Sequence, residues 1–231
     1  MSPLLSNILL DQLDKEIERR GLNYVRYADD FSIYTRSKIA ARAIGNAIYL
    51  FLRDKLKLPI NREKSGIRRP SSFKLLSYGF VPTYKKGERG TYQLVVKKSS
   101  WDSFKRKLKR ITKKTLGYKL EYRLSQLKLV WQGWLNNYRI ANIYTKLKKL
   151  DEWLRNRLRY CIWHDLKNPV RKRKNFIRLG VEQGQAYAWS RTRMGGWAVA
   201  QSPMLKTTIT ISRLKRRGYK SMLDYYYTLQ T

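Results

Sequence analysis

Residues Leu22–Arg36 read LNYVRYADDFSIYTR, and this stretch decides the fold of the chain around it. Two runs within it, Tyr24–Ala28 and Phe31–Thr35, alternate apolar and polar residues, which predicts two short strands. The strands are joined through Asp29 and Asp30. A tight turn between strands normally carries Asn-Gly or Asp-Gly, because such turns need positive φ angles, and Asp is a poor strand former. The hairpin therefore holds two acids that its fold does not require.

The two carboxylates have a chemical use. The chain carries 51 Lys and Arg against 16 Asp and Glu, so acids are scarce in it. Mg²⁺ prefers carboxylate oxygens and substrate phosphates as ligands. Two such ions about 4 Å apart can activate an attacking oxygen and stabilise a leaving one in phosphoryl transfer. The Asp29–Asp30 pair is therefore a candidate for metal binding, and a solvated turn without a ligand is the alternative.

The hairpin is predicted to lie between two helices. Leu5, Ile8, Leu9, Leu13 and Ile17 recur at helical spacing after Ser2, a suitable cap, and Pro3, which suits a first helical position. Ser37 is expected to cap a second helix that runs to about Leu58. Strands are predicted over Phe73–Pro82 and Thr91–Lys97, with a turn at 85–90. Residues 1–97 are therefore predicted to form an α+β domain.

The remaining residues, 98–231, are predicted to form a second, all-α domain. Apolar residues keep helical spacing from Ser99 onward, through Leu124–Ile140 and Ile143–Leu166. Pro169 interrupts the pattern before a short helix near Val170–Leu179. A loop-rich segment is expected next, and then a helix over Leu205–Arg217.

Charge indicates a polyanionic partner. The formal net charge is +35, and residues 91–231 hold 33 of the 51 Lys and Arg. Like charges four residues apart destabilise an unpaired helix, and RNA phosphates relieve that repulsion. A solvated charged face, as in a basic protein without catalytic activity, is the alternative. The predicted RNA-binding residues are Lys105, Arg106, Lys109, Arg110, Lys113, Lys114, Arg171, Lys172, Arg173 and Lys174.

Composition also bears on the compartment. The single cysteine, Cys161, allows no internal disulfide, which fits a reducing environment. No apolar run approaches the roughly 20 residues of a membrane span, so no membrane partner is expected. A cytosolic nucleic-acid-binding protein is predicted.

The ordered motifs resemble the palm of a reverse transcriptase. YADD between two strands, preceded by SPLLSNILLDQLD at 2–14, is similar to the metal-binding hairpin and nucleotide-pocket helix of that family. LPINREKS at 58–65 resembles its loop near the phosphates of the incoming nucleotide. FKLLSYGF at 73–80 resembles the strand that supports the primer end. The resemblance implies catalytic, metal-binding roles for Asp29 and Asp30. It also implies nucleotide-binding roles for Ser2, Pro3, Asn7 and Lys64.

The second part resembles the maturase domain of group II intron reverse transcriptases. The similar segments are YRLSQLKLVWQGWLNNYRIAN at 122–142, the D-x-W-x-R-x-R-L-R helix with W-x-x-x-K-x-P, and GWAVAQSPMLKTTITISRLKRRGYKSMLDYY at 196–226. The resemblance implies a partial palm over 1–97 and a helical thumb and maturase domain over 98–231. It also implies a mobile-element enzyme that copies RNA into DNA and assists intron splicing, in a bacterial or organellar cytoplasmic ribonucleoprotein. Its implied partners are group II intron RNA, an RNA/DNA template-primer and deoxynucleoside triphosphates.

One family feature is expected to be missing. Family members carry a first catalytic aspartate upstream of the SP-x-L-x-N helix, and this chain starts inside that motif. Asp11 and Asp14 are expected to be exposed acids and no substitutes. The two-metal site is therefore expected to be incomplete and the chain alone a poor polymerase, needing an N-terminal reverse-transcriptase fragment. The alternatives are a non-catalytic RNA-binding splicing cofactor and an inactive remnant of a truncated gene.

Overall fold

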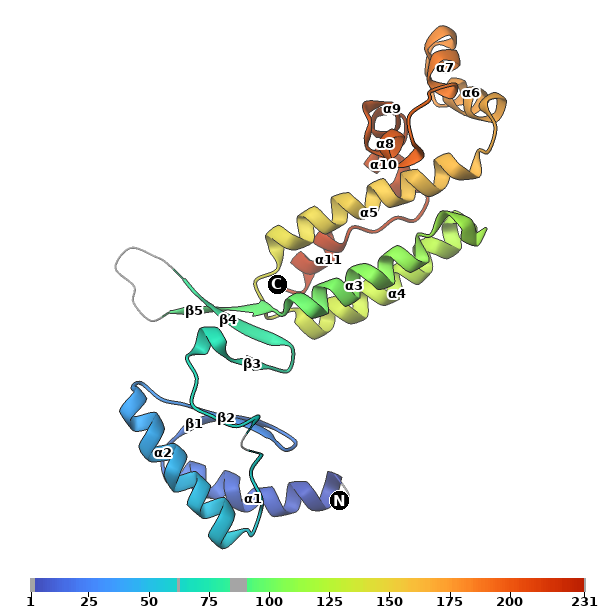
Figure 1. The fold of residues 1–231 in the computed structure, drawn as a ribbon. Helices are drawn as coiled ribbons and strands as arrows, with labels where there is room; N and C mark the ends of the chain where they lie inside the picture. The colour runs from blue at the N-terminus through green and yellow to red at the C-terminus, as the bar shows by residue number, and fades with distance from the viewer. Residues whose placement is uncertain (1–2, 62, 84–90, 231) are drawn as a thin grey trace. The chain divides into compact units, whose positions relative to one another are not determined.

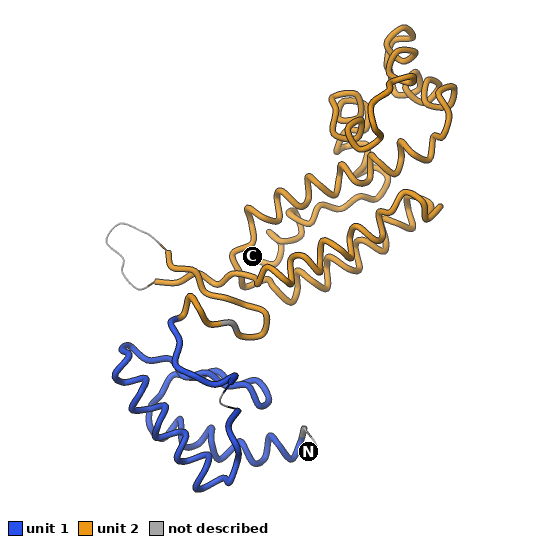
Figure 2. Tube along the Cα trace, viewed as in Figure 1, with its two compact units in different colours: residues 1–69 blue, residues 70–231 orange. Residues whose placement is uncertain are grey.

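The structure is a computed structural model that describes residues 3–61, 63–83 and 91–230. It mixes helices with two small antiparallel sheets, in agreement with the predicted α+β class (Figure 1). The chain divides into two compact units, residues 1–69 and 70–231 (Figure 2). The predicted domain boundary between residues 97 and 98 stays a prediction.

The first unit places the hairpin beside two helices. Its elements are α1 (Pro3–Arg19), β1 (Asn23–Tyr27), β2 (Asp30–Tyr34) and α2 (Lys38–Leu50), which continues as a π-helical turn over Phe51–Lys55. Ser37 caps α2 as predicted, its hydroxyl oxygen accepting a hydrogen bond of 3.1 Å from the backbone N–H of Ala40. Apolar side chains from α1, α2 and the turn form one core: Leu13, Ile17, Ile48, Leu52 and Leu56.

Three short strands open the second unit: β3 (Lys74–Leu75), β4 (Tyr78–Pro82) and β5 (Tyr92–Val96). They belong with the helices because Val96 is buried in the helical core and the Tyr78 hydroxyl donates to the backbone oxygen of Asn137. The predicted strand Phe73–Pro82 is wrong as one strand. Leu76 and Ser77, with φ angles of 49° and 70°, form a turn that divides it into a hairpin. The predicted turn at 85–90 lies outside the described residues.

Helices form the rest of this unit. Their bounds are α3 (Lys98–Ile111), α4 (Leu120–Tyr138), α5 (Tyr144–Asp165), α6 (Pro169–Arg178), α7 (Gln183–Ser190), α8 (Gly196–Gln201), α9 (Pro203–Thr208), α10 (Ile211–Arg216) and α11 (Met222–Thr228). The long helix α5 contacts α3, α8 and α11, so segments far apart in sequence meet along it (Figure 1). Leu147, Leu154 and Leu158 lie fully buried on its inner face.

Three sequence predictions for this unit are corrected. Ser99 does not cap α3, which already begins at Lys98. The segment expected to be loop-rich contains α7 and α8. The predicted helix Leu205–Arg217 is broken at Ile209, because the Thr210 hydroxyl accepts from the N–H of Arg213 and starts a new helix.

Candidate metal hairpin and nucleic-acid surface

The aspartate pair lies at the tip of the first hairpin. Tyr27 pairs with Asp30 across β1 and β2, which leaves Ala28 and Asp29 as a two-residue loop. The loop therefore falls one residue earlier than the predicted Asp29–Asp30 connection. Both aspartates are exposed. The positive φ that such a turn needs falls on Ala28, at 54°.

Arg26 ties this turn to α1. Its Nη1 donates to the backbone oxygen of Ala28 at 2.9 Å and to Oδ1 of Asn7 at 3.0 Å. Its Nη2 donates to Oδ2 of Asp14 at 2.6 Å, and its Nε lies 2.9 Å from each Asp14 carboxylate oxygen. The hydrogen bond with Asp14 raises the pKa of Arg26, so the guanidinium stays charged. The arginine thereby fixes the backbone just before Asp29 against the SP-x-L-x-N helix.

Asp14 corrects the expectation of exposed acids on α1. Its side chain is only 18% exposed and forms the ion pair with Arg26. Asp11 is 54% exposed and pairs with Lys15. Asp14 therefore serves the placement of the hairpin, a role that its spacing in the sequence does not reveal.

Asp29 and Asp30 fit a magnesium ion that keeps most of its ligand positions for water and substrate phosphates. Mg²⁺ usually takes one or two carboxylates and fills its other positions with water and substrate phosphates, and exposed Asp29 and Asp30 leave that space open. Within the described ranges, no three His, Cys, Asp or Glu side chains gather as a closed metal site. The hairpin would therefore supply two ligands, and a two-metal arrangement would need others.

The structure describes the four predicted nucleotide-binding residues to different extents. Asn7 is exposed on α1 and bound to Arg26. Ser2 lies outside the described residues, and Pro3 begins α1 without a described side chain. Lys64 is exposed after a turn in which the Asn61 side chain accepts from its N–H at 3.2 Å. Among the described residues, no hydrogen bond or ion pair joins Lys64 to the hairpin.

The Ala28 backbone gives a stability prediction. A left-handed φ costs an L-residue roughly 1–2 kcal/mol, and glycine avoids this cost. Ala28→Gly is therefore expected to raise the free energy of unfolding by about 1 kcal/mol. The matched control is Ala43→Gly at an exposed position within α2, where the same change is expected to cost about 1 kcal/mol. Urea unfolding should show opposite signs; two losses would contradict the strained turn.

The basic residues of α3 form an exposed surface without ion pairs among the described residues, and the Lys105 Nζ lies 5.1 Å from the centre of the Trp153 ring. Lys105, Arg106, Lys109 and Arg110 are exposed, while Phe104 and Leu108 are buried on the other side of the helix. No ion pair is formed by these four cations in the part of the chain that the structure describes. Lys113 is exposed just beyond α3, whereas Lys114 is half-buried with its Nζ 5.4 Å from the Tyr160 ring centre.

The predicted residues of α6 differ in the same way. Arg171 and Lys174 are exposed. Lys172 is half-buried with its Nζ 4.0 Å from the centre of the Trp163 ring, and burial lowers its pKa. Arg173 is half-buried beside the Tyr187 ring, at 5.6 Å. Arg171 and Lys174 are thus available to phosphates, whereas Lys172 and Arg173 already pack on aromatic rings.

Comparisons with family models match two regions of the chain. Residues 1–80 match the family described as Reverse transcriptase (RNA-dependent DNA polymerase), and residues 101–180 match the Group II intron, maturase-specific domain. The chain belongs to the group II intron reverse transcriptase and maturase family. Its partners therefore include nucleic acid, with intron RNA among them. No curated protein matched the chain. None of the helices in the described ranges has the length and apolar character of a membrane span.

The D-x-W-x-R-x-R-L-R motif uses all four of its charged positions, Asp151, Arg155, Arg157 and Arg159, for contacts within the protein. Asp151 is buried and accepts hydrogen bonds from the Tyr219 hydroxyl at 2.6 Å and the Ser221 hydroxyl at 3.1 Å, and pairs with Arg155. The Arg159 Nε donates to the backbone oxygen of Ile209 at 3.0 Å. Sequence reasoning missed these roles. The available signal was an acid and arginines placed four residues apart on a helix that also carries an apolar stripe along its length.

Arg123 and the motif's Arg157 bind the backbone carbonyl groups at the C-terminal end of α3. The Arg123 Nη1 donates to the backbone oxygens of Ile111 and Lys113, at 2.9 Å each. The Arg157 Nη2 donates to the backbone oxygen of Thr112 at 2.6 Å. The last carbonyls of a helix lack partners and carry partial negative charge, so cations stabilise them. Arg123 and Arg157 are therefore held by the protein's own backbone rather than by RNA.

Proposed function

We propose that this chain supplies the metal-binding hairpin of an RNA-directed DNA polymerase and the RNA-binding helices of an intron maturase. The observation that carries the proposal is the set of hydrogen bonds made by Arg26, which hold the turn before Asp29 against the helix that carries Asn7. A solvated turn has no need of a partly buried guanidinium bonded to three different residues. The basic surface of α3 supports the second activity, because unpaired cations there match RNA phosphates.

In the polymerase reaction, the 3′-hydroxyl of a primer attacks the α-phosphate of an incoming nucleotide and pyrophosphate leaves. Mg²⁺ held by Asp29 and Asp30 would supply charge stabilisation for the phosphate oxygens. Arg26 would keep the two carboxylates in place through Asp14 and the Ala28 backbone. Asn7 would help to shape the nucleotide site, and Lys64 would contact the phosphates.

Polymerisation is proposed to need a further carboxylate from another polypeptide segment. The hairpin supplies two acidic ligands, and the four acids of α1 have partners of their own: Asp11 pairs with Lys15, Asp14 with Arg26, Glu16 with Arg19 and Arg20, and Glu18 accepts from the Tyr24 hydroxyl. A reverse-transcriptase fragment with the first catalytic aspartate would complete the site in trans. Cytoplasmic ribonucleoproteins would be the setting of this assembly.

The experiment measures primer extension on an RNA template with Mg²⁺ and deoxynucleoside triphosphates. The chain alone should extend poorly, and addition of an N-terminal reverse-transcriptase fragment should restore extension. Asp29→Asn and Asp30→Asn should each reduce the restored rate at least about a hundredfold, because metal stabilisation is worth several kcal/mol. Both variants should bind intron RNA like the unmodified chain. Efficient extension by the unaided chain would overturn the proposed need for a partner segment.

A second candidate is a splicing cofactor without polymerase activity. The exposed cations of α3 and α6 favour it, since they require nothing from the hairpin. It predicts that the chain promotes splicing of a group II intron and that Asp29→Asn leaves this activity intact. A complemented polymerase that depends on Asp29 would argue against it as the sole function. An inactive remnant would neither bind intron RNA in a salt-dependent manner nor support extension.

A further inference from the structure

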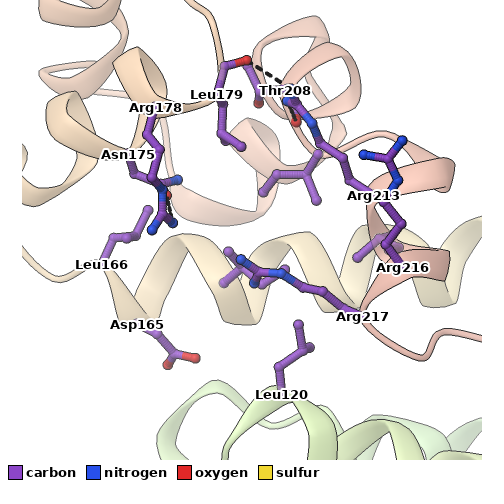
Figure 3. Close-up of a pocket in the computed structure, with 13 residues that line it drawn as sticks. Leu120, Asp165, Leu166, Asn175, Arg178, Leu179, Thr208, Arg213, Arg216 and Arg217 are labelled. Carbon is purple, nitrogen blue, oxygen red and sulfur yellow. Dashed lines mark hydrogen bonds between the residues drawn. The ribbon is translucent and has the colours of Figure 1, made fainter.

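A cavity of about 420 Å³ lies within the second unit, where the C-terminal part of α5 meets α6, α10 and the start of α4 (Figure 3). The family comparison to the maturase domain ends at residue 180, so the α10 side of this cavity lies beyond it. The cavity is well separated in sequence from Asp29 and Asp30. Its volume is in the range of pockets that hold one small ligand, roughly 300–1,000 Å³.

The cavity has an aliphatic lining. Its apolar side chains come from five helices and the residues that follow them: Leu120, Ile162, Leu166, Leu179, Ile209 and Leu214. Leu120 projects into it from the start of α4, and Leu166 faces it from the end of α5 (Figure 3). None of the described residues that line it is aromatic. Such a lining suits the face of a planar, weakly polar group.

Arginines surround this lining. Arg178, Arg213, Arg216 and Arg217 border the cavity, with Asp165 as the one acid among its described lining residues. Arg213 is committed to the fold, because it donates to the backbone oxygens of Thr208 at 2.6 Å and Leu179 at 3.0 Å. Arg178 is bonded only to the neutral amide of Asn175, at 2.9 Å.

Arg216 and Arg217 are uncommitted. Both are exposed, and in the described ranges neither side chain forms a hydrogen bond or an ion pair. The Arg217 side chain extends across the cavity in front of α5 (Figure 3). Three guanidinium groups without an acidic partner therefore lie at the edge of an aliphatic cavity. This combination would bind a ligand that has one anionic part and one flat, poorly hydrated part.

We propose that this cavity receives one unstacked nucleotide of the intron RNA. Its base would lie against Ile162 and Leu166, and its phosphates would contact Arg178, Arg216 and Arg217. Sequence-specific RNA recognition largely targets unpaired nucleotides whose bases are turned out of the helix. Inorganic phosphate would not use the aliphatic lining, and an apolar ligand would not use the arginines. The proposal rests on intron RNA binding, which is part of the proposed function.

The test uses the full chain and a structured group II intron RNA that contains 4-thiouridine. Ultraviolet crosslinking followed by peptide mapping is expected to join the RNA to segments 162–166 and 213–217. Arg217→Ala should remove these crosslinks and lower RNA affinity roughly tenfold, as expected for loss of a charge-assisted phosphate contact. Arg193→Ala is the matched control, because Arg193 is exposed, does not line the cavity and also removes one positive charge.

A substitution in the apolar lining tests the proposed base contact separately from the phosphate contacts. Leu166→Gln should reduce the crosslinks while leaving the dependence of affinity on salt unchanged, since no cation is removed. If Arg217→Ala binds intron RNA normally and crosslinks to it elsewhere in the chain, the cavity proposal is overturned and the proposed function still stands. Absence of any RNA binding by the unmodified chain would overturn both. Crosslinks that free uridine monophosphate abolishes without affecting RNA affinity would assign the cavity to a free nucleotide and overturn the proposal.

Discussion

Replacement of Asp151 by alanine is expected to lower the free energy of unfolding by about 3–5 kcal/mol, the typical cost of breaking a buried ion pair on one side. The Asp151 carboxylate is 3% exposed, and it accepts from Arg155, Tyr219, Ser221 and the backbone N–H of Met222. Alanine leaves these donors without an acceptor in the interior. Burial, and then the Asp151 charge, raise the pKa of Tyr219, so this hydroxyl keeps its proton and remains a donor at neutral pH.

Urea unfolding followed by far-ultraviolet circular dichroism measures the change, and two variants bracket it. Tyr219→Phe removes one hydrogen bond of the cluster and is expected to cost about 1–2 kcal/mol. Asp224→Ala removes an ion pair with Lys215 whose side chains are 62% and 51% exposed, and such surface pairs contribute about 0–1 kcal/mol. An Asp151→Ala loss no larger than that of Asp224→Ala would contradict a structural role for the motif's acid.

The Asp151 cluster also bears on the proposed RNA cavity. Tyr219 and Ser221 follow directly on Arg216 and Arg217, the uncommitted cations of that cavity. Their hydrogen bonds to Asp151 fasten the chain just after α10 to the long helix α5. A buried acid in α5 thus holds the segment that carries the proposed phosphate contacts. Its loss is expected to weaken RNA binding indirectly, in a variant whose cations are all retained.

Local patterns in the sequence were sufficient for the elements themselves. The alternation around YADD predicted the hairpin, and the apolar spacing of 124–140 and 143–166 predicted α4 and α5 to within a few residues. These features depend on residues close in sequence, whose periodicity records which side of a helix or strand is covered.

Features that depend on distant residues could not be predicted. Asp14 was expected to be exposed, because nothing nearby in sequence shows that Arg26 folds back onto it. Arg123 and Arg157 belong to a strongly basic chain, and only the fold shows that they terminate α3. The break at Ile209 depends on a single threonine cap, which the apolar pattern around it concealed. Charge alone therefore overestimates how many cations are available to RNA.

The cations that remain available give the second large prediction. Replacing Lys105, Arg106, Lys109 and Arg110 together by glutamine is expected to weaken intron RNA binding and to flatten its dependence on salt. Each phosphate contact contributes about 0.7–0.9 to the slope of log affinity against log salt, so loss of all four should reduce the slope by about 3. Helix α3 should remain folded, because its apolar residues Phe104 and Leu108 are buried and unchanged and glutamine is a good helix former.

A charge-preserving variant is the matched control for this change. Arg106→Lys and Arg110→Lys alter both arginines yet keep every positive charge, so the salt slope should stay close to that of the unmodified chain. Filter binding between about 50 and 200 mM salt, the range over which counterion release changes affinity strongly, resolves the difference. If the glutamine variant keeps the original slope, the α3 cations are a solvated face and the RNA must be held elsewhere. A reduced slope in both variants would instead indicate bidentate guanidinium contacts at Arg106 and Arg110, which an ammonium group cannot reproduce.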